Sequence, residues 1–133
     1  VPGGGVTLVN LTSVIVANNA DDAAVTAGKM ILKSALDQPF RILLENAGLN
    51  ADEWLPQVKG SKSAGHGVDV SNPTKLVDLK AAGIVDPARV TKEALLNAVS
   101  IAGTSITMGA LVVEVPEKKE AAGAPDMSGM GMM

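Results

Sequence analysis

Two groups of residues in this chain are of types that could bind a ligand. The first is the run Gly3-Gly4-Gly5, because glycine lets a ligand approach the main chain closely and N–H groups at a helix start face anions. The second is Asp86, which precedes Pro87 at a predicted helix start and keeps one carboxylate oxygen free for a sugar hydroxyl or a hydrated cation. On these residues alone, a flexible turn is the favoured interpretation of the glycines, and helix capping that of Asp86.

Patterns typical of a self-contained catalytic site are absent from the sequence. It contains neither a GxxxxGK[ST] phosphate loop nor GxGxxG after a strand, and no recognisable Ser–His nucleophile motif. The single histidine, His66, lies in a Gly-flanked loop, which favours a solvated residue over a ligand or a base. The carboxylate pairs Asp21/Asp22 and Asp52/Glu53 fall at predicted helix starts, where capping and the helix dipole explain them.

The composition narrows the possible partners and compartments. The 133 residues are 47% apolar but only 2% aromatic, carry a formal charge of −3 and include no cysteine. Disulfides and thiolate metal sites are therefore excluded, and the lack of a basic cluster argues against nucleic acid. No secretory signal is visible and no run approaches the roughly 18 apolar residues of a membrane span, so a cytoplasmic location is the default expectation. A first residue other than Met suggests that residues precede Val1.

Helices dominate the expected secondary structure. Sequence signals delimit the first two helices after residue 20. The first begins at the negative charges of Asp21 and Asp22 and continues with apolar residues at helical spacing. Pro39 ends it and opens the second, which Asp37 is expected to cap and Gly48 to end. These two helices cover residues 21–36 and 39–47. A short third helix follows a capping box at Asn50 and is limited or kinked by Pro56, and a fourth covers residues 74–82 before Gly83. A long helix begins at Pro87, and its apolar stripe consists of Leu95, Ala98, Val99, Ala102 and Ile106.

The sequence predicts few strands, and each of them is ambiguous, very short or without a partner. The apolar run from Val6 to Ala17 suits a buried strand or a buried helix, and its periodicity cannot decide between them. Residues 68–70 form a possible very short strand, and residues 111–115 a terminal one that needs a partner. Residues 117–133 are Gly- and Met-rich without periodicity, which predicts a disordered tail. The methionines of that tail suit soft metals, but without His or Cys a floppy tether is favoured.

Taken in order, these segments resemble the end of a group I chaperonin subunit of the GroEL family. Gly3–Val6 resembles the family's GGGV segment, and the tail resembles its Gly-Gly-Met repeats. The matching order and spacing extend over essentially the whole chain. The other matching segments are Gly83–Pro87, Arg89–Leu95, Ala98–Ala102 and Val113–Pro116.

The resemblance implies a mostly α fold, with residues 1–116 as the C-terminal part of an equatorial ATP-binding domain. It implies that Gly4 lies against bound ATP, that Asp86 contacts the ribose, and that Asp69, Val70 and Ser71 lie near the adenine. The adenine segment departs from the family's Gly-Tyr-Asn/Asp-Ala pattern. It has Val68 for the aromatic, Val-Ser for Ala-Ala and one extra residue before residue 74.

The resemblance also implies what must come from other polypeptide. The phosphate loop, the ligands for Mg and the client-binding apical domain belong to parts of the family's subunit not present among these residues. A complete subunit is expected to hydrolyse ATP, to form a double ring with other subunits, to bind a co-chaperonin and to enclose unfolded client proteins. The 133 residues alone are expected to be inactive.

Two other functions compete with this interpretation. A free-standing helical module that binds other proteins by an apolar face would form a stable monomer without nucleotide dependence. A small complete nucleotide-dependent enzyme would turn over ATP by itself, but the missing phosphate loop argues against it.

Overall fold

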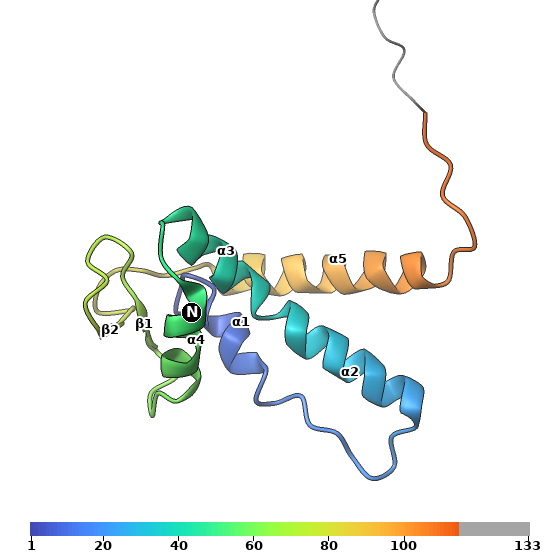
Figure 1. Cartoon of the computed structure of the whole chain (residues 1–133), viewed down its shortest axis with the longest axis horizontal. Helices are drawn as coiled ribbons and strands as arrows, with labels where there is room; N and C mark the ends of the chain where they lie inside the picture. Colours follow the sequence, from blue (N-terminus) through green and yellow to red (C-terminus); the bar gives the residue numbers. More distant parts are fainter. Residues whose placement is uncertain (115–133) are drawn as a thin grey trace, which may run out of the picture.

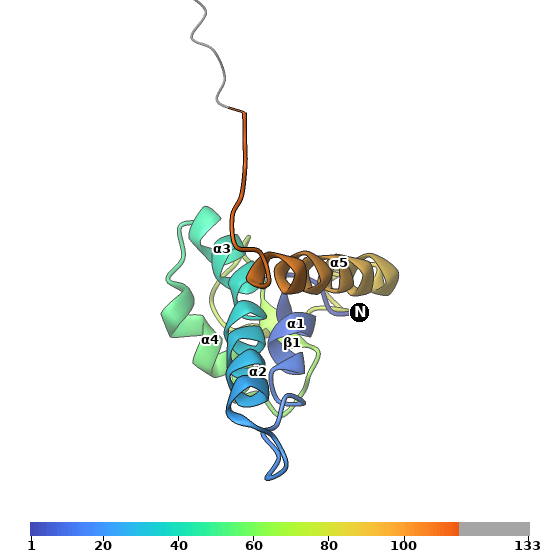
Figure 2. The ribbon, with the colours of Figure 1, turned by 90° about the vertical axis from the view of Figure 1, so that its right-hand side faces the viewer.

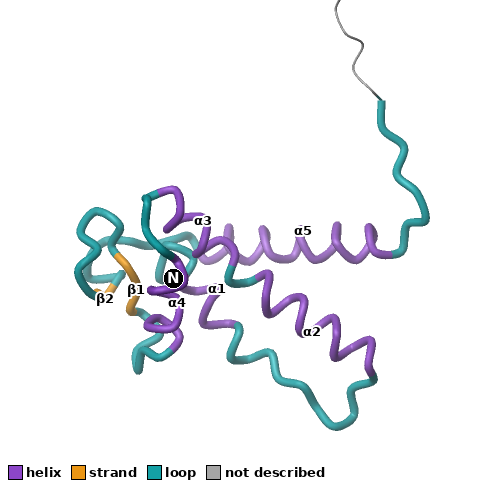
Figure 3. The backbone as a smooth tube through the Cα atoms, viewed as in Figure 1, coloured by secondary structure: helices purple, strands orange, loops and turns teal. Residues whose placement is uncertain are grey.

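The computed structural model describes residues 1–114, which form a mostly helical unit with one small hairpin (Figures 1 and 3). The predicted fold class is confirmed in this respect. The elements are α1 (Val6–Leu11), α2 (Ala23–Ala35), α3 (Gln38–Asn46), α4 (Ala51–Lys59), β1 (His66–Val68), β2 (Leu76–Asp78) and α5 (Ala88–Ile106).

The core lies where α1, α3, α4 and the hairpin meet. The main contacts between elements join α1 to α3 and α4, α3 to α4, and α4 to β1. Phe40 and Leu44 from α3 and Leu79 after β2 are almost completely buried there. With so few aromatic residues, aliphatic side chains fill the remaining space. The buried cluster consists of Val6, Val9, Phe40, Leu44, Ala51, Leu55, Val58, Val68 and Leu79.

A glycine turn makes the apolar run after it a helix rather than a strand. Gly4 and Gly5 have φ angles of 64° and 76°, a left-handed conformation that glycine adopts without steric cost. A Cβ on Gly5 would lie 2.8 Å from the backbone nitrogen of Phe40, so the turn packs directly against α3. The helix that follows is short and places Val6 and Val9 in the core.

The predicted helix over residues 74–82 is wrong. Its middle is β2, which pairs antiparallel with β1 so that His66 faces Asp78 and Val68 faces Leu76. The Asp78 carboxylate accepts hydrogen bonds from the N–H groups of Lys80 and Ala81 at 2.9 and 3.2 Å. An aspartate that bonds the backbone just ahead of it favours a turn over a continuing helix. Gly83, expected to end that helix, has a φ of 76° and ends this turn instead.

The predicted strand at residues 68–70 is displaced, because β1 ends at Val68. Asp69 accepts two local hydrogen bonds, from Ser71 N–H to its carboxylate at 2.9 Å and from Asn72 N–H to its carbonyl at 3.0 Å. These bonds turn the chain away from the strand direction. Residues 69–75 therefore form the loop of the hairpin.

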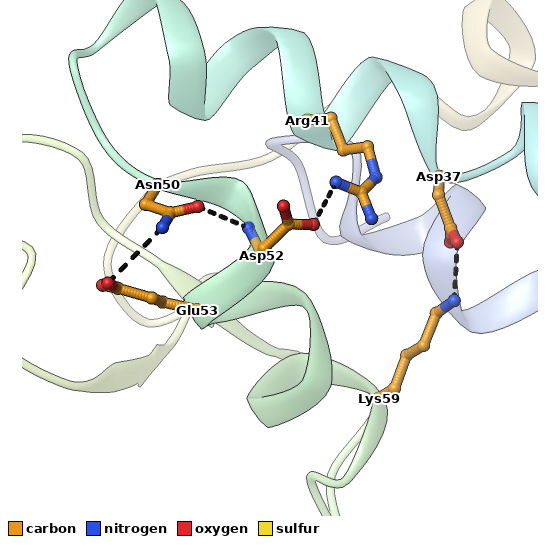
Figure 4. A network of polar contacts seen from close by, with 6 residues as sticks. All are labelled: Asp37, Arg41, Asn50, Asp52, Glu53 and Lys59. Carbon is orange, nitrogen blue, oxygen red and sulfur yellow. Dashed lines mark hydrogen bonds and ion pairs between the residues drawn. The ribbon is translucent and has the colours of Figure 1, made fainter.

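The α3–α4 connection follows the sequence signals closely. Gly48 has a φ of 75°, and the next N–H, that of Leu49, bonds back to the carbonyl of Leu44 at 2.9 Å, which ends α3 as predicted. The carbonyl oxygen of the Asn50 side chain accepts a bond from Asp52 N–H at 3.0 Å and caps α4 (Figure 4). Pro56 lies inside α4 and does not end it.

Two ion pairs join α3 and its N-terminal flank to α4 (Figure 4). Arg41 Nη1 lies 2.6 Å from Asp52 Oδ1, and Lys59 Nζ lies 2.6 Å from Asp37 Oδ2. The Asp52 carboxylate raises the pKa of Arg41 by hydrogen bonding. Asp37 stands at the N-cap position of α3 as predicted, but its side chain makes no capping bond. The Arg41–Asp52 pair is largely exposed and contributes at most about 1 kcal/mol, so it orients the two helices more than it stabilises them.

Helices α2 and α5 project from the compact part and diverge from each other (Figures 1 and 2). Asp22 caps α2 by accepting the Val25 N–H at 2.7 Å, as its position predicts. Neither helix contributes a buried residue. Within residues 1–114, no helix has the length and apolar character needed to cross a membrane.

The predicted strand over residues 111–115 is wrong for its first four residues, and Val115 lies outside the described residues. Residues 111–114 pair with no strand among the described residues, and they run away from the β1–β2 hairpin beyond the end of α5 (Figure 1). An unpaired strand cannot satisfy its own backbone groups, which explains the irregular conformation. The predicted tail, residues 117–133, also lies outside the described residues.

The Gly5 contact gives a stability prediction. Gly5→Ala should lower the free energy of unfolding by about 1–3 kcal/mol, because it combines left-handed strain with a clash against the Phe40 backbone. Gly48→Ala is the matched control, since Gly48 has the same kind of φ but open space around a Cβ, and should cost only about 1 kcal/mol. Urea titration followed by the fluorescence of Trp54, the only tryptophan, measures both. Equal losses in the two variants would contradict the packing argument.

Candidate functional site

A cavity of about 350 Å³ lies between the glycine turn, α3 and the hairpin loop. This volume falls within the roughly 300–1,000 Å³ of typical small-molecule sites. Four of the five predicted site residues line it, although they come from two segments more than sixty positions apart, and the fifth, Asp86, does not. The lining residues are Gly4, Phe40, Leu43, Leu44, Val68, Asp69, Val70, Ser71, Ala82 and Ile84.

The polar edge of the cavity is the hairpin loop. Asp69 is half-buried, and its Oδ1 accepts the Ser71 N–H at 2.9 Å. This bond fixes the turn that presents Val70, which is 47% exposed, beside the cavity. Only one of the two Asp69 oxygens takes part in a hydrogen bond among residues 1–114, so the other can accept a bond from a ligand.

The remaining walls of the cavity are apolar. Phe40 and Leu44 come from the buried face of α3, Val68 from β1 and Ile84 from the turn before α5. A cavity with apolar walls and a few convergent polar groups suits a flat, largely apolar ring with polar atoms at its edge. No Lys or Arg lines it, so the cavity by itself does not neutralise an anionic ligand.

Asp86 lies on the other side of the glycine turn. A Cβ added to Gly3 would come within 3.2 Å of Asp86 Oδ1 and 3.1 Å of Val85 N, so the segment before α5 packs tightly against this glycine. Gly3 N–H bonds to the carbonyl of Ile84 at 3.0 Å, and the backbones of Val1 and Asp86 exchange two bonds of 3.0 Å. The turn is therefore held between the cavity and the Asp86 carboxylate.

The predicted capping role of Asp86 is wrong. The N-cap position of α5 is Pro87, and no side chain caps this helix. The extended conformation of Pro87 moves the helix start to Ala88, one residue too far for the usual bond from Asp86. Within residues 1–114 the Asp86 carboxylate makes no hydrogen bond, which leaves both oxygens free for a ligand.

A second, larger concavity of about 810 Å³ separates α2 from α5. The predicted apolar stripe of α5 lies along it in full, and Asp86, Gly5 and Thr7 stand among its lining residues. Opposite the stripe are residues of α2 and of the start of α3, chiefly Ile31, Leu32, Ala35, Leu36 and Pro39. We call this concavity the α2–α5 cleft. A long apolar surface without a cover is unusual for an isolated globular unit.

Other titratable residues have structural roles. Asp21 Oδ2 accepts bonds from Asn18 N–H at 2.8 Å and Lys29 Nζ at 2.6 Å, and these bonds lower the pKa of Asp21, the backbone bond most. His66 lies in β1 rather than in a loop. Among residues 1–114, no group of three or more His, Cys, Asp or Glu is placed to hold a metal ion.

Sequence reasoning missed several cavity residues. Phe40, Leu43 and Leu44 lie within the helix predicted over residues 39–47, but helical spacing cannot tell which of them faces a cavity and which the core. Ile84 lies inside the Gly83–Pro87 segment without a distinguishing feature. Which of these residues line the cavity depends on how the glycine turn packs, with Gly5 against α3 and Gly3 against the segment that contains Ile84.

The chain matches a model of a known protein family over most of its length. Residues 1–116 match the family model described as the TCP-1/cpn60 chaperonin family. The match includes every residue that lines the cavity or the cleft.

The exposed cleft predicts how the isolated chain behaves. We expect it to self-associate and to bind apolar dyes, because the apolar faces of α2 and α5 are uncovered. Sedimentation velocity measures this, and Val99→Glu, inside the cleft, should reduce the association. Ile101→Glu is the control, since Ile101 is 68% exposed on the same helix but does not line the cleft. A chain that sediments as a monomer and binds no apolar dye would contradict the expectation.

Proposed function

Because this chain belongs to the TCP-1/cpn60 chaperonin family, whose members assemble into oligomers and act on client proteins, we propose that it forms one wall of the ATP site in the equatorial domain of a group I chaperonin subunit. The observation that carries the proposal is the cavity. The resemblance to the family implies that Gly4, Asp69, Val70 and Ser71 lie near bound nucleotide, and all four line this cavity.

The residues of the cavity fit the base of ATP. The accessible apolar surfaces of Val70, Ala82 and Ile84 suit the faces of a purine, and burying apolar area there supplies binding free energy of about 25 cal/mol per Å². A free carboxylate oxygen on Asp69 suits the exocyclic amino group of adenine, which donates hydrogen bonds. A carboxylate would disfavour guanine, which carries an acceptor oxygen at that position.

The residues around the glycine turn fit the sugar. Asp86 has two oxygens without a partner among residues 1–114, and a carboxylate accepts hydrogen bonds from ribose hydroxyls. Gly4 presents open main chain, because a Cβ there would meet no atom within 4 Å. The ligand would thus extend from the cavity across the glycine turn toward Asp86.

The phosphate end requires groups from other polypeptide. Neither the cavity nor the cleft is lined by Lys or Arg, and residues 1–114 include no cluster suited to a metal. Phosphoryl transfer needs positive charge and metal around the phosphates, which bound Mg and a phosphate loop would supply. The role of this chain is to hold the base and ribose so that the phosphates reach those groups.

The α2–α5 cleft fits the same proposal. Helices from the other part of the equatorial domain would cover its apolar walls and bury the apolar stripe of α5. In the assembled subunit, ATP binding and hydrolysis would shift the orientation of rigid domains. The proposed partners are subunits of a double ring, a co-chaperonin and unfolded proteins in the cytoplasm.

A helical interaction module remains the second candidate. The uncovered face of α5 favours it, because such a face could dock an amphipathic partner helix. The family match and the convergence of the predicted nucleotide residues favour the first candidate.

Asp86 provides the direct test of the ribose contact. In the full-length subunit, Asp86→Ala should weaken ATP affinity about tenfold, the effect of losing hydrogen bonds to a charged group. The thermal midpoint should not fall, because Asp86 does not cap α5. Calorimetric titration with ATP and a thermal melt measure the two quantities.

Glu93→Ala is the matched control for this experiment, since Glu93 is an exposed carboxylate on α5 that lines neither concavity. Unchanged ATP affinity in Asp86→Ala would remove Asp86 from the site. An equal loss in Glu93→Ala would indicate a general charge effect instead.

A further inference from the structure

Gly3 is buried against the segment that leads into α5. A Cβ at this position would lie 3.1 Å from Val85 N, 3.2 Å from the carbonyl carbon of Ile84 and 3.2 Å from Asp86 Oδ1. Gly3 has no positive φ, unlike the two glycines that follow it. A side chain at position 3 would therefore act by contact with residues 84–86 and not by left-handed backbone strain.

The atoms around Gly3 differ in how firmly they are held. Gly3 N–H donates to the carbonyl of Ile84 at 3.0 Å, and Pro2 forms an antiparallel β-bridge with Val85. The Asp86 carboxylate, in contrast, makes no hydrogen bond within residues 1–114. Because the backbone is paired and the carboxylate is not, an added methyl group would displace the carboxylate most readily.

We propose that Gly3 is a positioning residue, which fixes where the Asp86 carboxylate stands relative to the ribose of the bound nucleotide. The inference rests on the proposed ATP site, and it assigns Gly3 no contact with the ligand. With only hydrogen on its Cα, Gly3 lets the carboxylate lie close against the glycine turn. A methyl group at position 3 shifts the carboxylate by a few tenths of an ångström. Hydrogen bonds to the ribose weaken when their acceptor leaves its best distance and direction.

The test uses the full-length subunit and calorimetric titration with ATP. Gly3→Ala should raise the Kd for ATP about three- to fivefold, less than the loss in Asp86→Ala, because the carboxylate is displaced and not removed. Gly65→Ala is the matched control and should leave the Kd unchanged. Gly65 has no positive φ, lines neither concavity, and a Cβ there would meet only ordinary contacts of 3.8 and 4.0 Å.

Two further measurements show whether the effect passes through Asp86. The analogue 2′,3′-dideoxy-ATP lacks both ribose hydroxyls, so Gly3→Ala and wild type should bind it with Kd values within about twofold of each other. In an Asp86→Ala background, Gly3→Ala should change the Kd for ATP by less than about twofold. A merely structural effect on the site would weaken binding of both nucleotides and in both backgrounds.

Asp86→Glu tests the same idea without a change at Gly3. It keeps the negative charge but moves the carboxylate outward by one methylene group, so it should raise the Kd for ATP about threefold or more. The Kd for the dideoxy nucleotide should stay within about twofold of wild type, since that ligand makes no ribose contact. This variant also decides the question should Gly3→Ala fail to fold.

The outcomes separate this inference from the proposed function. An unchanged Kd for ATP in Gly3→Ala or in Asp86→Glu overturns the positioning role while leaving the ATP site in place. An equal loss for ATP and the dideoxy nucleotide, a further loss in the Asp86→Ala background, or an equal loss in Gly65→Ala also overturns it. If the wild-type subunit does not bind ATP, the proposed function itself fails.

Discussion

The contact between the glycine turn and α3 is the constraint on which the rest of this structure depends. Gly5 approaches the Phe40 backbone so closely that a methyl group could not fit between them. This approach sets the start of α1, brings Val6 and Val9 into the core, and leaves Gly4 at the edge of the cavity. On its other side, the turn is paired with the segment before α5, which places Asp86 beside Gly3. One backbone contact thus organises both parts of the candidate site.

The helices differ strongly in how much of their surface is buried. The elements α1, α3, α4 and the hairpin bury an aliphatic core, whereas α2 and α5 contribute no buried residue. Their apolar sides face each other across the cleft without filling it. Hydrophobic surface of this extent is stable only when covered, so the arrangement suits a unit that is completed by further polypeptide.

Local signals predicted the helix boundaries, and tertiary contacts decided the rest. Gly48, Asp22 and Asn50 end or cap helices where the sequence indicates, because each acts on its nearest backbone groups. The segment around Leu76 was misjudged, since its pairing with β1 and the turn at Asp78 override helical spacing. Strand formation at Leu111 failed for want of a partner.

The membership of the candidate site was predictable only in part. Residues of the loop after Val68 and of the glycine run were identified by resemblance, whereas the places of Phe40 and Ile84 in the cavity wall are set by tertiary contacts that the sequence does not show. Photolabelling of the full-length subunit with 2-azido-ATP, followed by peptide mapping, tests the central claim most directly. We expect the label on the peptide that contains residues 68–71, competed away by ATP. Label confined to peptides outside residues 1–116 would contradict the claim that this chain forms a wall of the nucleotide site.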